Sequence, residues 1–174
     1  MARCLYNSTI CAFLQLSPEA LLGRFVNNYH GAALTTTNEA WNNEIFEYDI
    51  PRLGKRIDVV LLLRGLIFCL EFKVGERDML QSNIEQVLDY ALDLKNFHLL
   101  SQNRIIVPIL VPTRFRTSSS EFIPSVYNDS IYNPLVTGAN GLQKLIGDIL
   151  VHAGATAPDP SLGADWVISP YSPT

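Results

Sequence analysis

Three charged residues, Asp58, Glu71 and Lys73, interrupt two segments of the chain that are otherwise apolar. Burial of an unpaired carboxylate is costly unless a cation or a proton compensates its charge. Lys73 supplies one positive charge for the two carboxylates, so one negative charge is left over. A Mg²⁺ or Mn²⁺ ion held by Asp58 and Glu71 would resolve the conflict, because hard cations bind a few carboxylates together with water and phosphate oxygens. The alternative is a salt bridge between Lys73 and one of the acids near a sheet edge.

Two strands are predicted to position these charges. Residues 57–63 and 66–74 are long apolar runs of the kind found in sheets that are covered on both faces. The glycine in the turn at residues 64–65 indicates a two-residue hairpin loop. Centred on that turn, the hairpin register places Asp58 opposite Glu71.

A helix is expected over residues 76–97, beside the charged face of the second strand. Side chains alternate along a strand, so Glu71 and Lys73 share one face. The helix has an apolar stripe that would pack on the sheet, made of Leu80, Ile84, Val87, Leu88 and Ala91. Asn83, Gln86 and Tyr90 gather on the flank of this stripe at three- and four-residue spacing. They would lie at the rim of the charged site, or they form an ordinary helix surface with a half-buried tyrosine.

The pattern of Asp58 followed by Glu71-Phe72-Lys73 resembles the D…ExK signature of the PD-(D/E)XK nuclease superfamily. Gln86 and Tyr90 match the QxxxY element of its RecB-like branch. The segments IPRLGKRIDVVLL and ADWVISPYSPT are similar to a prokaryotic family in which such a domain precedes a helicase-like P-loop ATPase.

This resemblance implies a metal-dependent nuclease, with DNA as the favoured substrate and a role in prokaryotic defence. Asp58 and Glu71 would hold Mg²⁺ or Mn²⁺, and Lys73 would orient the attacking water or stabilise the transition state. Gln86 and Tyr90 would position the nucleic acid or order the site. The implied partners are nucleic acid and a helicase-like ATPase domain or subunit, and a homo-oligomer remains open.

In this superfamily an acid upstream of the sheet often completes the metal site. Glu19, Glu39, Glu44 and Glu47 all compete for that role, and we favour Glu44. For each of them the alternative is a solvated side chain.

A basic cluster of Arg52, Lys55 and Arg56 precedes Asp58. Such a cluster could contact the phosphates of a nucleic acid. A solvated turn is the alternative interpretation of the same three residues.

The expected order of elements is a helix over 18–29, a strand over 45–50, the hairpin, the helix over 76–97, a strand over 104–111 and a helix over 141–152. This order predicts an α/β fold with a mixed central sheet flanked by helices. The resemblance specifies a restriction-endonuclease-like αβββαβ core. Pro108 predicts that its strand is broken or lies at an edge.

Residues 1–152 are expected to form the nuclease-like domain, and the proline-rich residues 153–174 a linker towards an ATPase domain absent from the chain. The chain of 174 residues is 48% hydrophobic and 17% charged, which suits one domain with a core. Three cysteines without metal-ligand spacing, no signal peptide and no membrane-spanning run predict a cytoplasmic protein that does not enter a membrane.

The net charge of −4 argues against a strong free-standing nucleic-acid binder, although a local basic patch is compatible with it. Two further functions therefore stay open. In the first, the chain is a non-catalytic nuclease-fold module that binds nucleic acid or a partner ATPase. In the second, the three charges form a buried ion-pair network in a structural domain.

Overall fold

The computed structural model describes residues 44–51, 54–116, 130–155 and 162–172, and the helix expected over residues 18–29 lies outside them. The sheet has five strands in the order β1 (Glu44–Ile50), β2 (Lys55–Leu63), β3 (Leu66–Lys73), β4 (Ile105–Pro112) and β5 (Leu135–Val136). Strands β1 to β3 are antiparallel, whereas β4 is parallel to β3 and β5 is parallel to β4. The predicted mixed α/β sheet is therefore confirmed.

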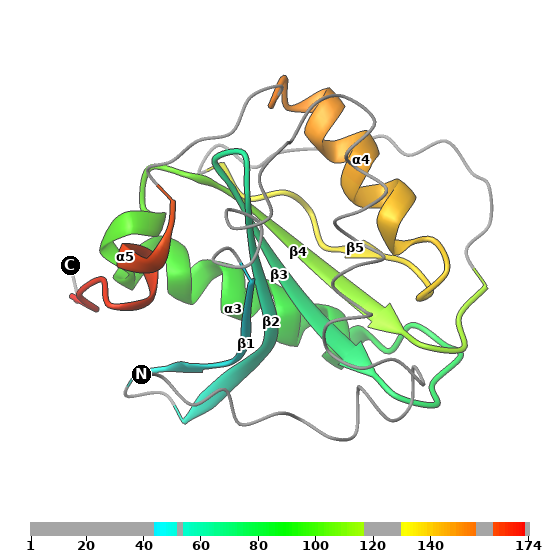
Figure 1. The fold of residues 1–174 in the computed structure, drawn as a ribbon. Coiled ribbons are helices and arrows are strands. Elements are labelled where there is room, and N and C mark those ends of the chain that lie inside the picture. The colour runs from blue at the N-terminus through cyan, green and yellow to red at the C-terminus, as the bar shows by residue number, and fades with distance from the viewer. Residues whose placement is uncertain (1–43, 52–53, 117–129, 156–161, 173–174) are drawn as a thin grey trace.

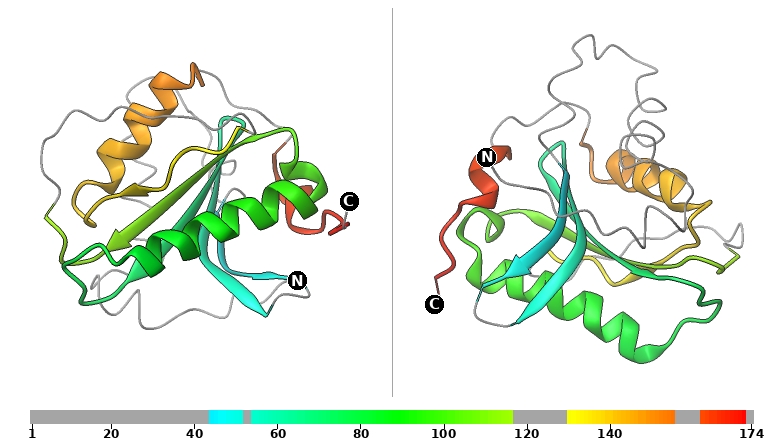
Figure 2. Two further views of the ribbon diagram at one scale, coloured as in Figure 1. Left: turned by 180° about the vertical axis from the view of Figure 1, so that it is seen from behind. Right: turned by 60° about the horizontal axis from the view of Figure 1, so that its bottom comes forward.

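Helices cover both faces of this sheet. Within the described residues the helices are α3 (Gln81–Phe97), the 3₁₀ turn η2 (Leu99–Ser101), α4 (Leu142–His152) and the short α5 (Ala164–Val167). Helices α3 and α5 lie against one face and α4 lies over the other, as the two further views show (Figures 1 and 2). Within the described ranges, no helix is both long and apolar enough to cross a membrane.

The hairpin between β2 and β3 has the register expected from the sequence. Val59 pairs with Leu70 and Leu63 pairs with Leu66, so the loop has two residues. Arg64 and Gly65 adopt φ of 50° and 84°, and positive φ at both central residues is the type I′ geometry that matches the twist of a hairpin.

The alternation of side chains between the two faces breaks at Asp58. Val59 packs in the layer under α4 and Val60 in the layer under α3, yet Ile57 also packs under α3. The opposite position on β1 is Glu47, which has a φ of 49°, and its backbone pair with Asp58 is missing from the ladder. Such local irregularities bend strands and redirect side chains, and β1 and β2 curve strongly in this region (Figure 1).

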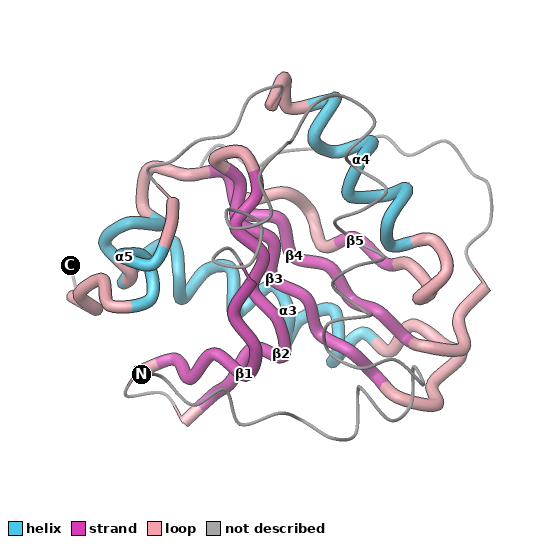
Figure 3. The backbone as a smooth tube through the Cα atoms, viewed as in Figure 1, coloured by secondary structure: helices cyan, strands magenta, loops and turns pink. Residues whose placement is uncertain are grey.

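The helix expected from residue 76 begins at Gln81, five residues later. Residues 74–80 form a loop instead, drawn as a loop between β3 and α3 in Figure 3. The Gly75 N–H donates to Thr113 Oγ1 at 2.9 Å, and the Arg114 N–H donates to the Glu76 carbonyl at 2.9 Å. The Glu76 carbonyl, which a helix from residue 76 would pair with the Leu80 N–H, is thus bonded to the segment that follows β4.

The prediction that Pro108 breaks β4 or places it at an edge is wrong. Strand β4 is continuous and lies between β3 and β5, with Pro108 opposite Cys69. The Ile106 N–H donates to the Ser130 carbonyl, so even-numbered residues of β4 direct their backbone groups away from β3. The missing N–H of Pro108 therefore removes no hydrogen bond from the β3–β4 ladder.

Residues 162–172 pack on the domain, although the proline-rich composition predicted a linker there. The side chain of Trp166 is completely buried beside Tyr48 and α3, and Tyr171 forms a β-bridge with His98. This part of the expected linker therefore belongs to the fold. The ATPase domain beyond it stays a prediction.

A closed cycle of hydrogen bonds holds this C-terminal segment. Trp166 Nε1–H donates to Ser101 Oγ at 2.9 Å, Ser101 Oγ lies 2.7 Å from His98 Nδ1, and His98 Nε2 lies 2.9 Å from the Trp166 carbonyl oxygen. Because the Trp166 carbonyl oxygen can only accept, Nε2 of His98 carries a proton. Burial lowers the pKa of His98 to about 4, and in the resulting neutral imidazole Nδ1 accepts from the Ser101 O–H, which itself accepts from the indole N–H.

Candidate active site

Strand β3 presents Glu71 and Lys73 on the face covered by α3, while Phe72 packs on the opposite face under α4. The predicted alternation is thus confirmed. Glu71 is only 5% exposed, and Lys73 Nζ lies 2.9 Å from its Oε1 atom. A charged pair therefore lies on the covered face of β3, where a buried strand would ordinarily carry apolar side chains.

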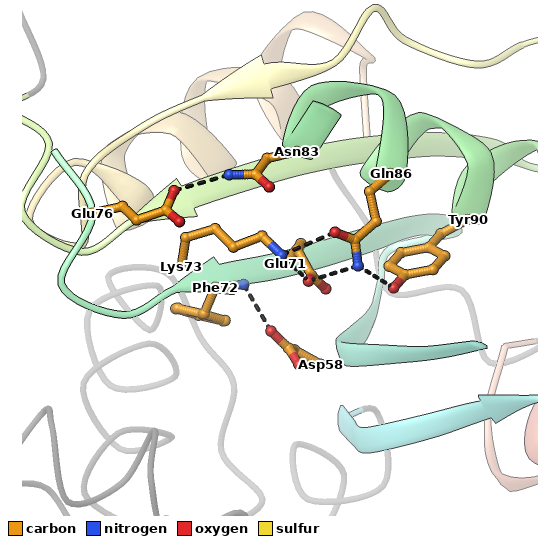
Figure 4. Close-up of polar contacts among 8 residues, drawn as sticks. All are labelled: Asp58, Glu71, Phe72, Lys73, Glu76, Asn83, Gln86 and Tyr90. Carbon is orange, nitrogen blue, oxygen red and sulfur yellow. Dashed lines mark hydrogen bonds and ion pairs between the residues drawn. The ribbon is translucent and has the colours of Figure 1, made fainter. Parts of the chain in front are cut away.

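Asp58 reaches the same place from β2. The last backbone pair of the hairpin is Val59 with Leu70, and beyond it the Phe72 N–H donates to Asp58 Oδ2 at 2.8 Å (Figure 4). The Asp58 carboxylate thus takes the hydrogen bond that a carbonyl of β2 would accept in a regular ladder. The register predicted Asp58 beside Glu71, and the structure brings the two together.

Helix α3 adds a glutamine that contacts both members of the charged pair. Gln86 Oε1 accepts from Lys73 Nζ at 2.9 Å, and its Nε2 donates to Glu71 Oε1 at 3.0 Å and to the Tyr90 hydroxyl at 2.6 Å. One amide therefore satisfies the ammonium and the carboxylate at once, and these contacts fix its orientation.

Tyr90 lies on the buried face of α3 and not on the flank that the spacing predicted. Its exposure is 3%, and it shares this face with Val87, Ala91 and Leu94. Leu80, assigned to the apolar stripe from the sequence, lies before the helix and is half exposed. The ring of Tyr90 thus anchors the helix while its hydroxyl holds Gln86.

The charges of the site do not balance. Burial, and then the charge of Asp58, raise the pKa of Glu71 to about 6 against the opposing effects of Lys73 and Gln86. Burial also raises the pKa of Asp58, although the Phe72 N–H and Lys73 act in the other direction. Two carboxylates share one lysine, as the sequence indicated.

The metal-free protein is expected to lose stability as pH rises past the pKa of Glu71. The folded state holds this proton up to about pH 6, whereas the unfolded chain releases it at the ordinary value of 4.5, so stability falls as pH rises between them. Glu71→Gln removes this dependence. The difference in free energy of unfolding between Glu71→Gln and wild type should therefore shift by about 2 kcal/mol in favour of the variant as the pH rises from acidic to neutral.

Urea unfolding in EDTA at several pH values measures this difference. His98 titrates with the opposite sign, because its lowered pKa makes stability rise with pH, so only the difference between Glu71→Gln and wild type reports on Glu71. A variant that becomes less stable than wild type as the pH rises would instead identify Glu71 and Lys73 as a structural ion pair.

The donor set fits a divalent cation. Glu71 Oε2 is buried and has no hydrogen-bond partner among the described residues. An unsatisfied carboxylate oxygen beside a second carboxylate is an arrangement that Mg²⁺ would satisfy, since this ion commonly takes one or two protein carboxylates and completes its shell with water and phosphate oxygens. In the described ranges, no group of three or more His, Cys, Asp or Glu side chains could hold a metal by itself.

The favoured upstream acid, Glu44, begins β1 opposite Leu61, and its side chain lies outside the description. Glu19 and Glu39 lie outside the described residues altogether. Glu47 is the candidate that lies near the site, as its contribution to raising the pKa of Asp58 indicates. Its positive φ is part of the break in strand pairing opposite Asp58, and no residue pattern predicts it.

The basic cluster is divided between two acidic groups. Lys55 Nζ lies 3.5 Å from Asp89 and 3.8 Å from Asp93 on α3, whereas Arg56 lies 3.3 Å from Glu47 Oε2. Arg52 lies outside the described residues. Contact of these residues with nucleic acid stays a prediction, and the nearby acids reduce the attraction expected for phosphate.

Sequence reasoning missed Glu76. Its Oε2 accepts from Asn83 Nδ2 at 2.9 Å, which connects the loop after β3 to the first turn of α3 (Figure 4). On the helix expected over residues 76–97 the two residues would lie two turns, about 10 Å, apart and would not touch. They meet because Glu76 lies in the loop before α3.

Comparison with known proteins finds no match to this chain among family models, curated proteins or solved structures.

Proposed function

We propose that the chain is a metal-dependent nuclease that hydrolyses phosphodiester bonds, with DNA as the favoured substrate. The observation that carries the proposal is the unsatisfied, buried Oε2 of Glu71 beside Asp58, with a single lysine for both carboxylates. The order β1-β2-β3-α3-β4 supports a restriction-endonuclease-like core, and the helix expected from the sequence over residues 18–29 would complete the αβββαβ pattern.

Asp58 and Glu71 would hold Mg²⁺ or Mn²⁺. When bound, the ion would supply a more acidic water and polarise the phosphoryl oxygen. Lys73 Nζ would donate a hydrogen bond to the attacking water or to the charge that develops on the phosphate. Gln86 Oε1 keeps the ammonium in place, and the Tyr90 hydroxyl keeps Gln86 in place. The reaction joins a water oxygen to phosphorus and transfers its proton to the oxygen that leaves.

Calorimetric titration of Mg²⁺ or Mn²⁺ is the test of this site. Wild type is expected to bind the ion, and Asp58→Ala to lose most of the affinity. Asp148→Ala removes an exposed acid on α4 and should bind as wild type does. Cleavage of single-stranded and double-stranded DNA and of RNA then identifies the substrate. Wild-type protein that binds no metal and cuts none of these substrates would contradict the proposal.

A non-catalytic nuclease-fold module is the second candidate function. The acids beside Lys55 and Arg56 favour it, because they weaken the basic surface that a nuclease would present to its substrate. Such a module would bind nucleic acid or a helicase-like ATPase without cleavage, and it would have no use for a metal between Asp58 and Glu71. The metal titration therefore separates the two candidates.

A further inference from the structure

The loop of residues 74–80 carries exposed aliphatic side chains directly after the catalytic strand. Val74, Met79 and Leu80 are 41%, 52% and 50% exposed, which makes them three of the large apolar side chains that the described part of the chain leaves in solvent. The loop begins at the residue after Lys73 and ends where α3 begins. A ligand bound at Lys73 would therefore lie next to it.

The loop is fixed at both ends. Gly75 and Arg114 make backbone hydrogen bonds that connect it to the end of β4, as described above. At the other end, the Asn83 side chain binds Glu76 and the Asn83 N–H donates to the Leu80 carbonyl at 3.0 Å. The aliphatic side chains of Met79 and Leu80 are thus neighbours on a backbone held by hydrogen bonds, where they can serve together as an apolar contact surface.

The charges around the loop favour a nucleic acid over a purely apolar partner. Arg77 lies within the loop, and Arg114 and Arg116 lie in the segment that is hydrogen-bonded to it, and all three are exposed. Asp78 is the opposing exposed acid, since Glu76 is engaged with Asn83. Guanidinium groups contact phosphates, whereas Met and Leu side chains offer an apolar surface to a base.

We propose that Met79 and Leu80 pack against an unpaired base next to the phosphate held at Lys73, so that the site selects single-stranded nucleic acid or frayed ends over intact duplex. In an intact duplex each base face is covered by stacked neighbours, so aliphatic side chains can pack on a base face where the base is unstacked, as in a single strand or a frayed end. The inference rests on the proposed function for the position of the phosphate. The base contact itself can be measured by binding alone, without cleavage.

The test is the double variant Met79→Ser/Leu80→Ser, measured by fluorescence anisotropy in Ca²⁺ with a labelled single-stranded oligonucleotide and the matching duplex. Wild type is expected to prefer the single strand, and the variant to bind it about tenfold more weakly, which is near the low end of the range known for removing an aromatic stacking contact to a base. Duplex binding should not change. The control Val151→Ser/Ile168→Ser removes two aliphatic side chains of 81% and 79% exposure elsewhere on the surface, and it should bind as wild type does.

Cleavage assays of the same proteins separate the two proposals. If the single-strand preference is lost in the double variant but wild type cleaves nothing, the base contact stands and the nuclease function fails. If wild type cleaves and the variant binds and cleaves single strands equally well, the nuclease function stands and the base contact is overturned. Wild type that binds no nucleic acid overturns both. Thermal melts establish that the variant is folded, which is expected because both side chains are exposed.

Discussion

Under the proposed nuclease function, Lys73→Met is expected to reduce phosphodiester cleavage by about 100- to 1000-fold, the usual effect of removing one preorganised electrostatic group from an active site. Lys73 is the cation in contact with Glu71, and its side chain is 21% exposed, so the ammonium borders both the buried carboxylates and the solvent from which a substrate arrives. Methionine retains most of the apolar stem and removes the charge. The rate is measured at saturating Mg²⁺ on a labelled oligonucleotide.

Metal affinity distinguishes a catalytic role of Lys73 from a structural one. Lys73 Nζ binds Glu71 Oε1, so its removal should leave Mg²⁺ binding intact or strengthen it, whereas Asp58→Ala should weaken it. The matched control is Lys144→Met, which removes an exposed lysine paired with Asp148 on α4 and should cleave at the wild-type rate. Lys73→Met with wild-type cleavage would exclude this lysine from the chemistry.

The core of the site could be predicted because it depends on local rules. A two-residue turn fixes the register of β2 and β3, and alternation then fixes which side chains share a face. Asp58, Glu71 and Lys73 come together as predicted, and their charges remain unbalanced. The position of Gln86 followed from its helical spacing relative to the strand.

What could not be predicted depends on contacts between distant segments. Helix propensity alone allows α3 to begin at residue 76, but the Gly75 N–H donates to Thr113 and the Glu76 carbonyl accepts from Arg114, and these bonds hold residues 74–80 as a loop. Glu47 lies opposite Asp58 only because β1 pairs with β2, and its positive φ has no counterpart in residue type. The partners of Lys55 on α3 likewise come from another element.

The C-terminal stretch shows how tertiary burial can override composition. Its proline content is typical of linkers, and no periodic apolar pattern marks it as part of the core. Trp166 nevertheless enters the layer between the sheet and α3, where it meets Tyr48 and His98. The presence of one large aromatic residue was the feature of the sequence that indicated burial of this stretch, because a tryptophan buries a large apolar area.

Trp166→Ala is expected to destabilise the fold by about 3–5 kcal/mol, the usual cost of emptying the site of a buried large aromatic side chain. The substitution also removes the donor to Ser101 Oγ and opens the hydrogen-bond cycle that includes His98. Trp166→Phe retains much of the volume and loses only the N–H, so its cost should be smaller, about 1–3 kcal/mol. Urea unfolding of the full chain at neutral pH measures both values.

The neighbouring Val167 provides the control, because it lies on the same short helix but is 42% exposed. Val167→Ala should change the free energy of unfolding by less than about 0.5 kcal/mol. If residues 162–172 were a linker, Trp166→Ala would be as neutral as this control, and the strong difference between adjacent positions would vanish. If Trp166→Ala is strongly destabilising and Trp166→Phe is destabilising to a smaller extent, both the volume of the side chain and the hydrogen-bond cycle hold the segment on the domain.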